Sequence, residues 1–206
     1  MKTSLNSLKW ATLALTFSFL TTSCDLFNKD KEDPKPATNE ITYNSTKYTL
    51  DESLMIKYGS FSVYGDEDTH VNNDFYIANG NIDYNNSTGN VEEINGNLAI
   101  HAELASPGAT EFKTGTFNYI DGSNDNSLSE AQLEAKYKNK PFFEAGIYID
   151  TNGNGLMSDE TPVKANGGTI KVSGSNNTYT LDFDLTLTNG KTLKGRNAST
   201  FSAING

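Results

Sequence analysis

The sequence has few of the residues on which several kinds of binding and catalysis depend. It contains one cysteine, Cys24, so no disulfide can form within the chain, and two histidines, His70 and His101. A zinc site built from nitrogen and sulfur ligands is therefore not expected. Basic residues are also scarce, because 16 Lys and Arg stand against 26 Asp and Glu, giving a net charge of −10. This charge argues against binding to nucleic acid, which requires a basic face.

The longest apolar stretch is short and lies near the amino terminus, at residues 10–20. Lys2 and Lys9 precede it, and the small residues 21–23 lead from it to Cys24. A helix that crosses a bilayer needs about 20 apolar residues, so this stretch is too short to span one. A basic start, an apolar middle and small residues at the end are typical of a secretory signal peptide, which we expect at residues 1–23.

A lone cysteine after small residues resembles the lipobox of bacterial lipoproteins, here Thr21-Thr22-Ser23-Cys24. In that family the thiol receives a diacylglycerol, and a peptidase cleaves before the cysteine. The match departs at one position, because the usual Leu three places before Cys is Thr21, and Leu20 lies four places before. The resemblance implies a lipoprotein of the outer membrane of Bacteroidota, on its periplasmic face or at the cell surface, with acyl chains such as palmitate on Cys24. The alternative is an ordinary signal peptide with an incidental cysteine.

Residues 24–40 predict a charged, flexible tether. Six of the seven positions 29–35 are charged, and Pro34 and Pro36 stiffen its end. Such a segment cannot bury enough apolar surface to pack. It also resembles the surface-export signal of Bacteroidota lipoproteins, although a generic charged linker has the same composition. Cleavage would remove two lysines, leaving 14 basic and 26 acidic residues and a net charge of −12 on residues 24–206.

The rest of the chain, residues 41–206, has the pattern of a single antiparallel β domain. Short apolar segments alternate with turn residues, and Asn outnumbers every other residue type. Residues 178–188 alternate strictly between apolar and polar side chains, and Asn189-Gly190 then predicts a type I′ hairpin turn. About ten strands in one domain predict a β-sandwich or barrel, because an open sheet of that width would curl or split. The expected strands are 41–43, 47–50, 55–64, 75–78, 97–104, 115–120, 142–150, 169–173, 178–188 and 191–201.

One short surface helix interrupts this pattern. Ser127 and Glu130 predict a capping box, and the following eight residues favour a helix with acidic residues early and basic residues late. Few of its side chains are apolar, so it would lie at the surface in a long connection between strands. It is either a lid beside a binding cleft or a cap over a sheet edge.

Residues 150–161 resemble the calcium loop of EF-hands and dockerins. Oxygen-bearing side chains stand at alternate positions, and a glycine follows at the sixth position, where the loop turns sharply. Thr161 replaces the usual bidentate acid at position 12, and the flanks predict strands rather than helices. The resemblance implies structural Ca²⁺ that braces a hairpin, and the alternative is an Asn-Gly turn that binds nothing. The implied ligands are Asp150, Asn152, Asn154, Leu156, Asp159 and Glu160.

Other constellations are weaker. Acidic clusters around Asp121 and around Asp66 are further metal candidates, and otherwise solvated turns. Paired carboxylates hydrolyse glycosides when they lie about 5 to 9 Å apart. Most carboxylates of an acidic β protein are surface charges, so we do not expect an enzyme. The nominal candidates for such a pair are Glu92, Glu93, Glu103 and Glu144.

Aromatic residues crowd into residues 43–84. Exposed tyrosines would suit stacking on sugar rings, whereas buried ones would form the core of the domain. Residues 168–195 also resemble the carboxyl-terminal β meander of uncharacterised Bacteroidota lipoproteins. Together these patterns favour a lipid-anchored β module that binds an extracellular glycan or protein. The alternatives are a small hydrolase that acts on polysaccharide and a structural envelope protein without a small ligand.

Overall fold

The computed structural model describes residues 38–151, 153, 156 and 161–206. In this part of the chain, eleven strands form one sheet that curls into a half-barrel, with one α-helix and one 3-10 turn. The all-β prediction is therefore confirmed. The strands are β1 (Glu40–Tyr43), β2 (Thr46–Thr49), β3 (Glu52–Phe61), β4 (His70–Asn85), β5 (Asn90–Pro107), β6 (Gly115–Tyr119), β7 (Phe142–Ile149), β8 (Val163–Ser175), β9 (Thr178–Leu187), β10 (Thr192–Thr200) and β11 (Ser202–Asn205).

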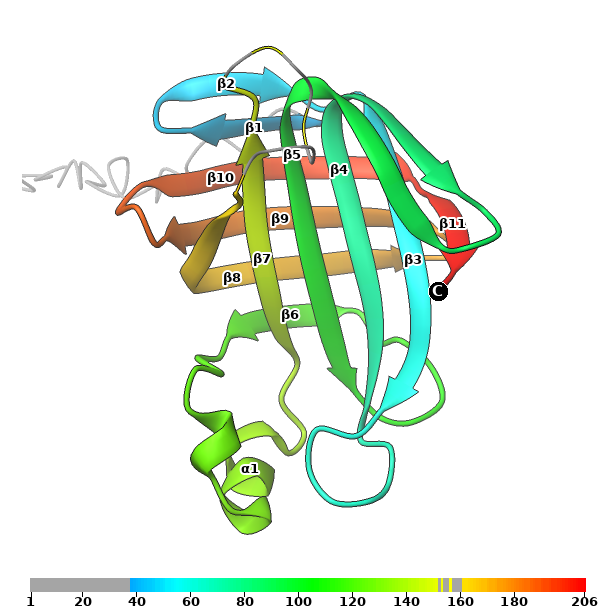
Figure 1. Cartoon of the computed structure of the whole chain (residues 1–206), viewed down its shortest axis with the longest axis vertical. Coiled ribbons are helices and arrows are strands. Elements are labelled where there is room, and N and C mark those ends of the chain that lie inside the picture. Colours follow the sequence, from blue (N-terminus) through cyan, green and yellow to red (C-terminus); the bar gives the residue numbers. More distant parts are fainter. Residues whose placement is uncertain (1–37, 152, 154–155, 157–160) are drawn as a thin grey trace, which may run out of the picture. The chain divides into compact units, whose positions relative to one another are not determined.

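The sheet order is β11-β3-β4-β5-β7-β6-β8-β9-β10-β1-β2, and most neighbours are antiparallel. The group β3, β4, β5 and β7 runs across the group β8, β9, β10 and β1, so that the two arms of the sheet face each other (Figure 1). The sequence did not predict β11, which pairs in parallel with β3. After β11 the backbone N–H of Gly206 still donates to the carbonyl oxygen of Lys57 at 3.1 Å.

The main core lies between the two arms. Phe75 of β4 is fully buried and packs edge-on against Phe201, with ring centroids 5.2 Å apart, and against Tyr179 of β9 at 5.8 Å. The alternation predicted for β9 is confirmed, because Leu181 and Leu185 are fully buried while every second residue points outward. Burying one such side chain stabilises the fold by about 1.5 to 3 kcal/mol, so the facing arms hold each other in place.

The type I′ hairpin turn occurs at a different place from the one predicted. Among the residues of the Asn189-Gly190 turn, only Gly190 has a positive φ, at 77°, so this is not a type I′ turn. The backbone N–H of Gly190 donates to the carbonyl oxygen of Leu187, which fits a three-residue loop that ends in a left-handed glycine. The type I′ geometry occurs instead between β8 and β9, where Asn176 and Asn177 have φ of 53° and 63°. Asparagine tolerates this region better than most residues, because its short side chain bonds locally.

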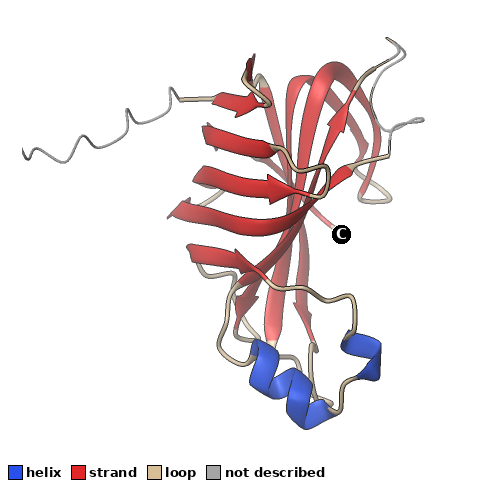
Figure 2. Ribbon diagram, turned by 90° about the vertical axis from the view of Figure 1, so that its left-hand side faces the viewer, coloured by secondary structure: helices blue, strands red, loops and turns tan. Residues whose placement is uncertain are grey.

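The helix α1 (Glu130–Tyr137) lies beyond the ends of β4, β5 and β7 (Figures 1 and 2). It starts later than predicted, because residues 125–127 form a 3-10 turn, η1, and Leu128 is extended. The capping box forms at Ser129 instead of Ser127, and the backbone N–H of Ser129 donates to Gln132 Oε1 at 2.9 Å. No helix among the described residues is long and apolar enough to span a membrane.

The hairpin of β4 and β5 is much longer than predicted and bends sharply. Its register shifts where Gly80 pairs with Gly96, and a Cβ on either glycine would lie 1.8 Å from a carbonyl oxygen of the other strand. Beyond this pair the hairpin folds toward β11 (Figure 1). Ile82 and Ile94 thereby join a second apolar cluster on the outer face of the sheet, with Leu54, Ile56, Tyr76, Ala78, Ala99 and Leu156.

Candidate functional site

Next to the second apolar cluster, the outer face of the sheet carries a row of acidic side chains, the acidic row. Asp74 of β4 is the register partner of Glu103 of β5, and Glu103 is the register partner of Glu144 of β7. Side chains directly opposite on neighbouring strands have Cβ atoms about 5 Å apart, so three carboxyl groups follow one another across three strands. Glu103 and Glu144 are exposed, whereas Asp74 is 5% exposed.

His101 lies in the adjacent row and joins the buried end of this acidic row. Its Nε2 atom lies 3.0 Å from Asp74 Oδ2 and 4.0 Å from Glu103 Oε1. The other oxygen of Asp74 accepts a hydrogen bond from Asn72 Nδ2 at 3.0 Å. The ring of Tyr76 stacks on the imidazole, with centroids 4.3 Å apart and planes 10° apart. The stack and the hydrogen bonds together hold Asp74 and His101 in defined orientations.

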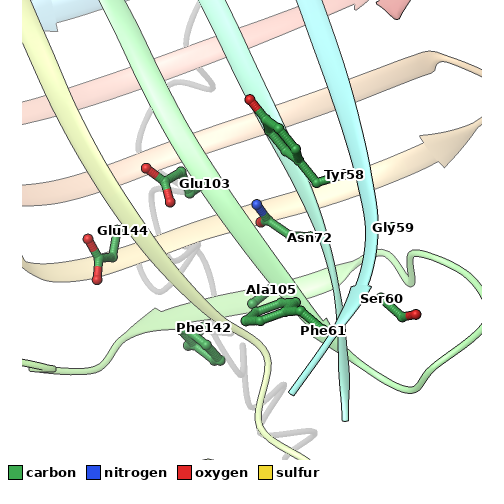
Figure 3. Close-up of a pocket in the computed structure, with 9 residues that line it drawn as sticks. All are labelled: Tyr58, Gly59, Ser60, Phe61, Asn72, Glu103, Ala105, Phe142 and Glu144. Atoms are coloured by element: carbon green, nitrogen blue, oxygen red, sulfur yellow. The ribbon is translucent and has the colours of Figure 1, made fainter. Parts of the chain in front are cut away.

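A groove of about 350 Å³, the outer groove, runs beside this row. A β-bulge in β3 shapes it, because the register passes from Lys57 to Gly59 and leaves Tyr58 without a partner. Bulges re-aim side chains, and Tyr58 is 50% exposed, the one large hydrophobic side chain exposed to this degree among the described residues. Figure 3 shows Tyr58, Glu103 and Glu144 on the same face of the sheet. The lining residues are Tyr58, Gly59, Ser60, Phe61, Asn72, Glu103, Ala105, Phe142 and Glu144.

A second hollow of about 270 Å³, the side hollow, adjoins the outer groove. Glu103 and Glu144 line both, so they form the ridge between them. The side hollow is more polar, and Lys164 at the start of β8 contributes a positive charge. Its lining residues are His101, Glu103, Glu144, Ala145, Gly146, Tyr148, Pro162 and Lys164.

The electrostatics of this face follow from its crowded carboxylates. Partial burial raises the pKa of Glu103, the negative charge of Asp74 raises it further, and Glu144 adds to the same effect, while His101 and Lys164 oppose it. The pKa of Tyr58 is also raised, first by its partial burial and then by Asp74 and Glu103. These shifts mark a locally negative surface that favours groups carrying a positive charge or donating hydrogen bonds.

Of the candidate pair residues named from the sequence, the structure brings two together. Glu103 and Glu144 are direct neighbours, whereas Glu92 and Glu93 lie on the bent end of the hairpin and are exposed there. Sequence reasoning missed the contribution of Asp74, because residues 73–78 of β4 are all buried and show no alternation. Glu103 does alternate with the buried Ala102 and Leu104, but alternation gives no strand register.

The other predicted sites have different outcomes. Asp125 in the Asp121 cluster pairs with Lys136 and Tyr137, and so fastens the helix instead of forming an open site. His70 lies apart from His101 and is fully buried, with Nδ1 3.0 Å from Thr69 Oγ1. Of the aromatics at 43–84, Tyr43, Phe75 and Tyr76 are buried as the core alternative predicted, four others are partly buried, and Tyr58 is exposed.

The predicted calcium loop and lipobox lie largely outside the described residues. Cys24, Asn152, Asn154, Asp159 and Glu160 are not described. Of the remaining predicted ligands, Leu156 is buried and its backbone N–H donates to the carbonyl oxygen of Ile94 at 2.9 Å. The Oδ1 atom of Asp150 accepts a hydrogen bond from the backbone N–H of Gly153 at 2.6 Å. Calcium binding therefore stays a prediction.

Comparisons with protein-family models, with curated proteins and with solved structures found no match.

Proposed function

We propose that this chain is a lipid-anchored binding module of the bacterial outer membrane, and that the outer groove binds a carbohydrate of the extracellular or periplasmic space. One observation carries the proposal for the groove: an exposed tyrosine on a β-bulge faces a row of carboxyl groups. Sugar rings present an apolar face and a rim of hydroxyls, which match an aromatic ring and hydrogen-bond acceptors respectively.

Different residues of the outer groove supply the apolar contact and the hydrogen bonds that a sugar needs. Tyr58, Phe61 and Phe142 supply apolar surface on which a ring can lie. Glu103, Glu144 and Asn72 supply acceptors, and Asn72 also a donor, for the hydroxyls. The volume of about 350 Å³ suits one or two sugar units, since small-molecule sites are commonly about 300 to 1,000 Å³.

The binding experiment compares three versions of the full chain on a glycan array and by calorimetry. Tyr58→Ala removes the ring and is expected to weaken binding about tenfold, which corresponds to about 1.4 kcal/mol. Tyr58→Phe keeps the ring and is expected to bind almost as the unaltered chain does. Equal binding by all three versions, or no bound glycan at all, would contradict the proposal and favour a structural envelope protein.

The lipid anchor is tested separately. Labelled palmitate should enter the chain when it is expressed in a Bacteroidota host, and Cys24→Ser should abolish the label. Label that persists in Cys24→Ser would refute lipidation at this residue. Protease treatment of intact cells then distinguishes the cell surface from the periplasmic face.

A hydrolase is the second candidate, and the pairing of Glu103 with Glu144 favours it. As register partners they have Cβ atoms about 5 Å apart, so their carboxyl groups can reach the separation of about 5 to 9 Å that glycosidases use. The raised pKa of Glu103 suits the proton donor, and Glu144 would be the partner carboxylate. Release of reducing sugar that is lost in both Glu103→Gln and Glu144→Gln, with glycan binding retained, would establish this activity. Binding without sugar release would exclude it for the glycan tested.

A further inference from the structure

Two side chains of the acidic row and the adjacent His101 have the chemistry and spacing of metal ligands. Asp74, His101 and Glu103 each offer one ligand atom, and these atoms all lie within 4.8 Å of one another. Ligand atoms on one zinc ion lie about 3 to 3.5 Å apart, because each bond is about 2.0 to 2.2 Å long. The His101 nitrogen is 3.0 Å from Asp74 Oδ2 and 4.0 Å from Glu103 Oε1, so a small rotation of the exposed Glu103 side chain would complete the set.

We propose that Asp74, His101 and Glu103 bind a divalent transition-metal ion, with Zn²⁺ as the reference case. The nitrogen ligand distinguishes this site from calcium and magnesium sites, whose ligands are oxygens. Imidazole together with carboxylates suits zinc and its neighbours in the first transition row. The sequence argument against zinc considered nitrogen and sulfur ligands, and it did not count carboxylates that the fold brings beside His101.

The surroundings hold these ligands in place. Asn72 donates to the second oxygen of Asp74 and orients that carboxylate, and Tyr76 stacks on the imidazole. Such partners outside the ligand set raise metal affinity by fixing ligand orientation. All three ligands also lie on β4 and β5, which are paired on both sides and therefore more rigid than loops.

The charge balance also favours a cation. Asp74 and Glu103 carry two negative charges when ionised, which would neutralise a divalent ion, and Glu144 is the next residue in the row. Asp74 is almost fully buried and contacts His101 and Asn72, and a metal ion would add a positive charge beside it. Because Glu103 lines both the outer groove and the side hollow, the remaining coordination positions would face a space that water or a ligand can enter.

The test measures Zn²⁺ binding to the full chain carrying Cys24→Ser, which removes the single thiol as a competing ligand. Calorimetry is expected to show one high-affinity site, and Co²⁺ is expected to give visible d–d absorption at the same stoichiometry. His101→Gln and Glu103→Gln should each weaken binding at least about tenfold. Glu93→Gln, an exposed acid on the same strand, and Asp150→Asn, in the predicted calcium loop, should leave the affinity unchanged.

Two results would overturn the proposal: no saturable binding at about 1 mM Zn²⁺, or equal affinity in His101→Gln and the parent. Thermal melting shows which variants fold, and the exposed position of Glu103 makes Glu103→Gln informative even where His101→Gln fails to fold. The measurement needs no glycan, so its result is independent of the function proposed for the outer groove. If the chain has no metal site, Asp74 and His101 form only an internal hydrogen-bonded pair, and neither His101→Gln nor Glu103→Gln changes zinc affinity.

Discussion

The paired glycines of the long hairpin make a quantitative prediction about how the outer face is built. At Gly80 a side chain meets two obstacles, a φ of +130° and a carbonyl oxygen of Asn95 that would lie 1.8 Å from the new Cβ. Backbone strain of this kind costs about 1 to 3 kcal/mol. The steric overlap involves backbone, which yields less readily than a side chain, and adds about 1 to 3 kcal/mol. Gly80→Ala should therefore lower the free energy of unfolding by about 2 to 6 kcal/mol.

Substitutions at two other glycines measure the cost of backbone strain and the cost of steric overlap separately. Gly96 has the same 1.8 Å overlap, with Asn79, but no positive φ, so Gly96→Ala should lose only about 1 to 3 kcal/mol. Gly190 has a φ of +77° and open space around it, so Gly190→Ala should lose about 1 to 2 kcal/mol. The assay is urea unfolding followed by circular dichroism, in which m is about 2 kcal/mol per M. If Gly80→Ala and Gly190→Ala lose the same free energy, the steric argument is refuted.

Three further predictions concern the core and the helix end. Burial lowers the pKa of His70, so the fold favours its neutral form; this stabilisation is present above the unfolded pKa of about 6.5 and is lost as the pH falls through the folded value. The stability of the unaltered chain should therefore drop below about pH 6.5 relative to that of His70→Gln, and parallel pH profiles from the two chains would contradict this. Phe117→Ala should lose about 3 to 5 kcal/mol, because Phe117 is fully buried and stacks on Phe112, and a loss below about 1 kcal/mol in urea unfolding would contradict this packing. Gln132→Ala should lose about 1 kcal/mol by the same assay, since the side chain of Gln132 accepts two hydrogen bonds at the helix start.

The fold class could be predicted from periodicity, and the lengths of its strands could not. Strand β9 shows strict alternation, so its bounds were predicted to within a residue. Strands β4 and β5 were predicted too short, because their outer ends contain Asn and Gly instead of a clear apolar alternation. Strand β11 has four residues and pairs in parallel with β3, which lies far away in the sequence, so no local signal marks it.

The candidate site could be predicted only in part, for a similar reason. Alternation assigns residues such as Glu103 and Glu144 to an outward face, but it does not give the register that makes them neighbours. The contact of Asp74 with His101 depends on a β4–β5 register set partly by the Gly80 and Gly96 bulge. Tyr58 is exposed because of a bulge in β3, and a bulge has no reliable signal in a single sequence.

The pairing of β11 with β3 has a practical consequence for every assay described above. It brings Gly206 so close to Tyr58 that a Cβ on this glycine would lie 2.4 Å from the tyrosine ring. Residues fused after Gly206, such as an affinity tag, would leave the sheet beside the outer groove and compete with a ligand for Tyr58. A histidine tag there would also bring metal-binding groups near His101. Binding should therefore be measured on chains without a carboxyl-terminal fusion, and a tag removed by a protease that leaves no extra residues keeps the outer groove open.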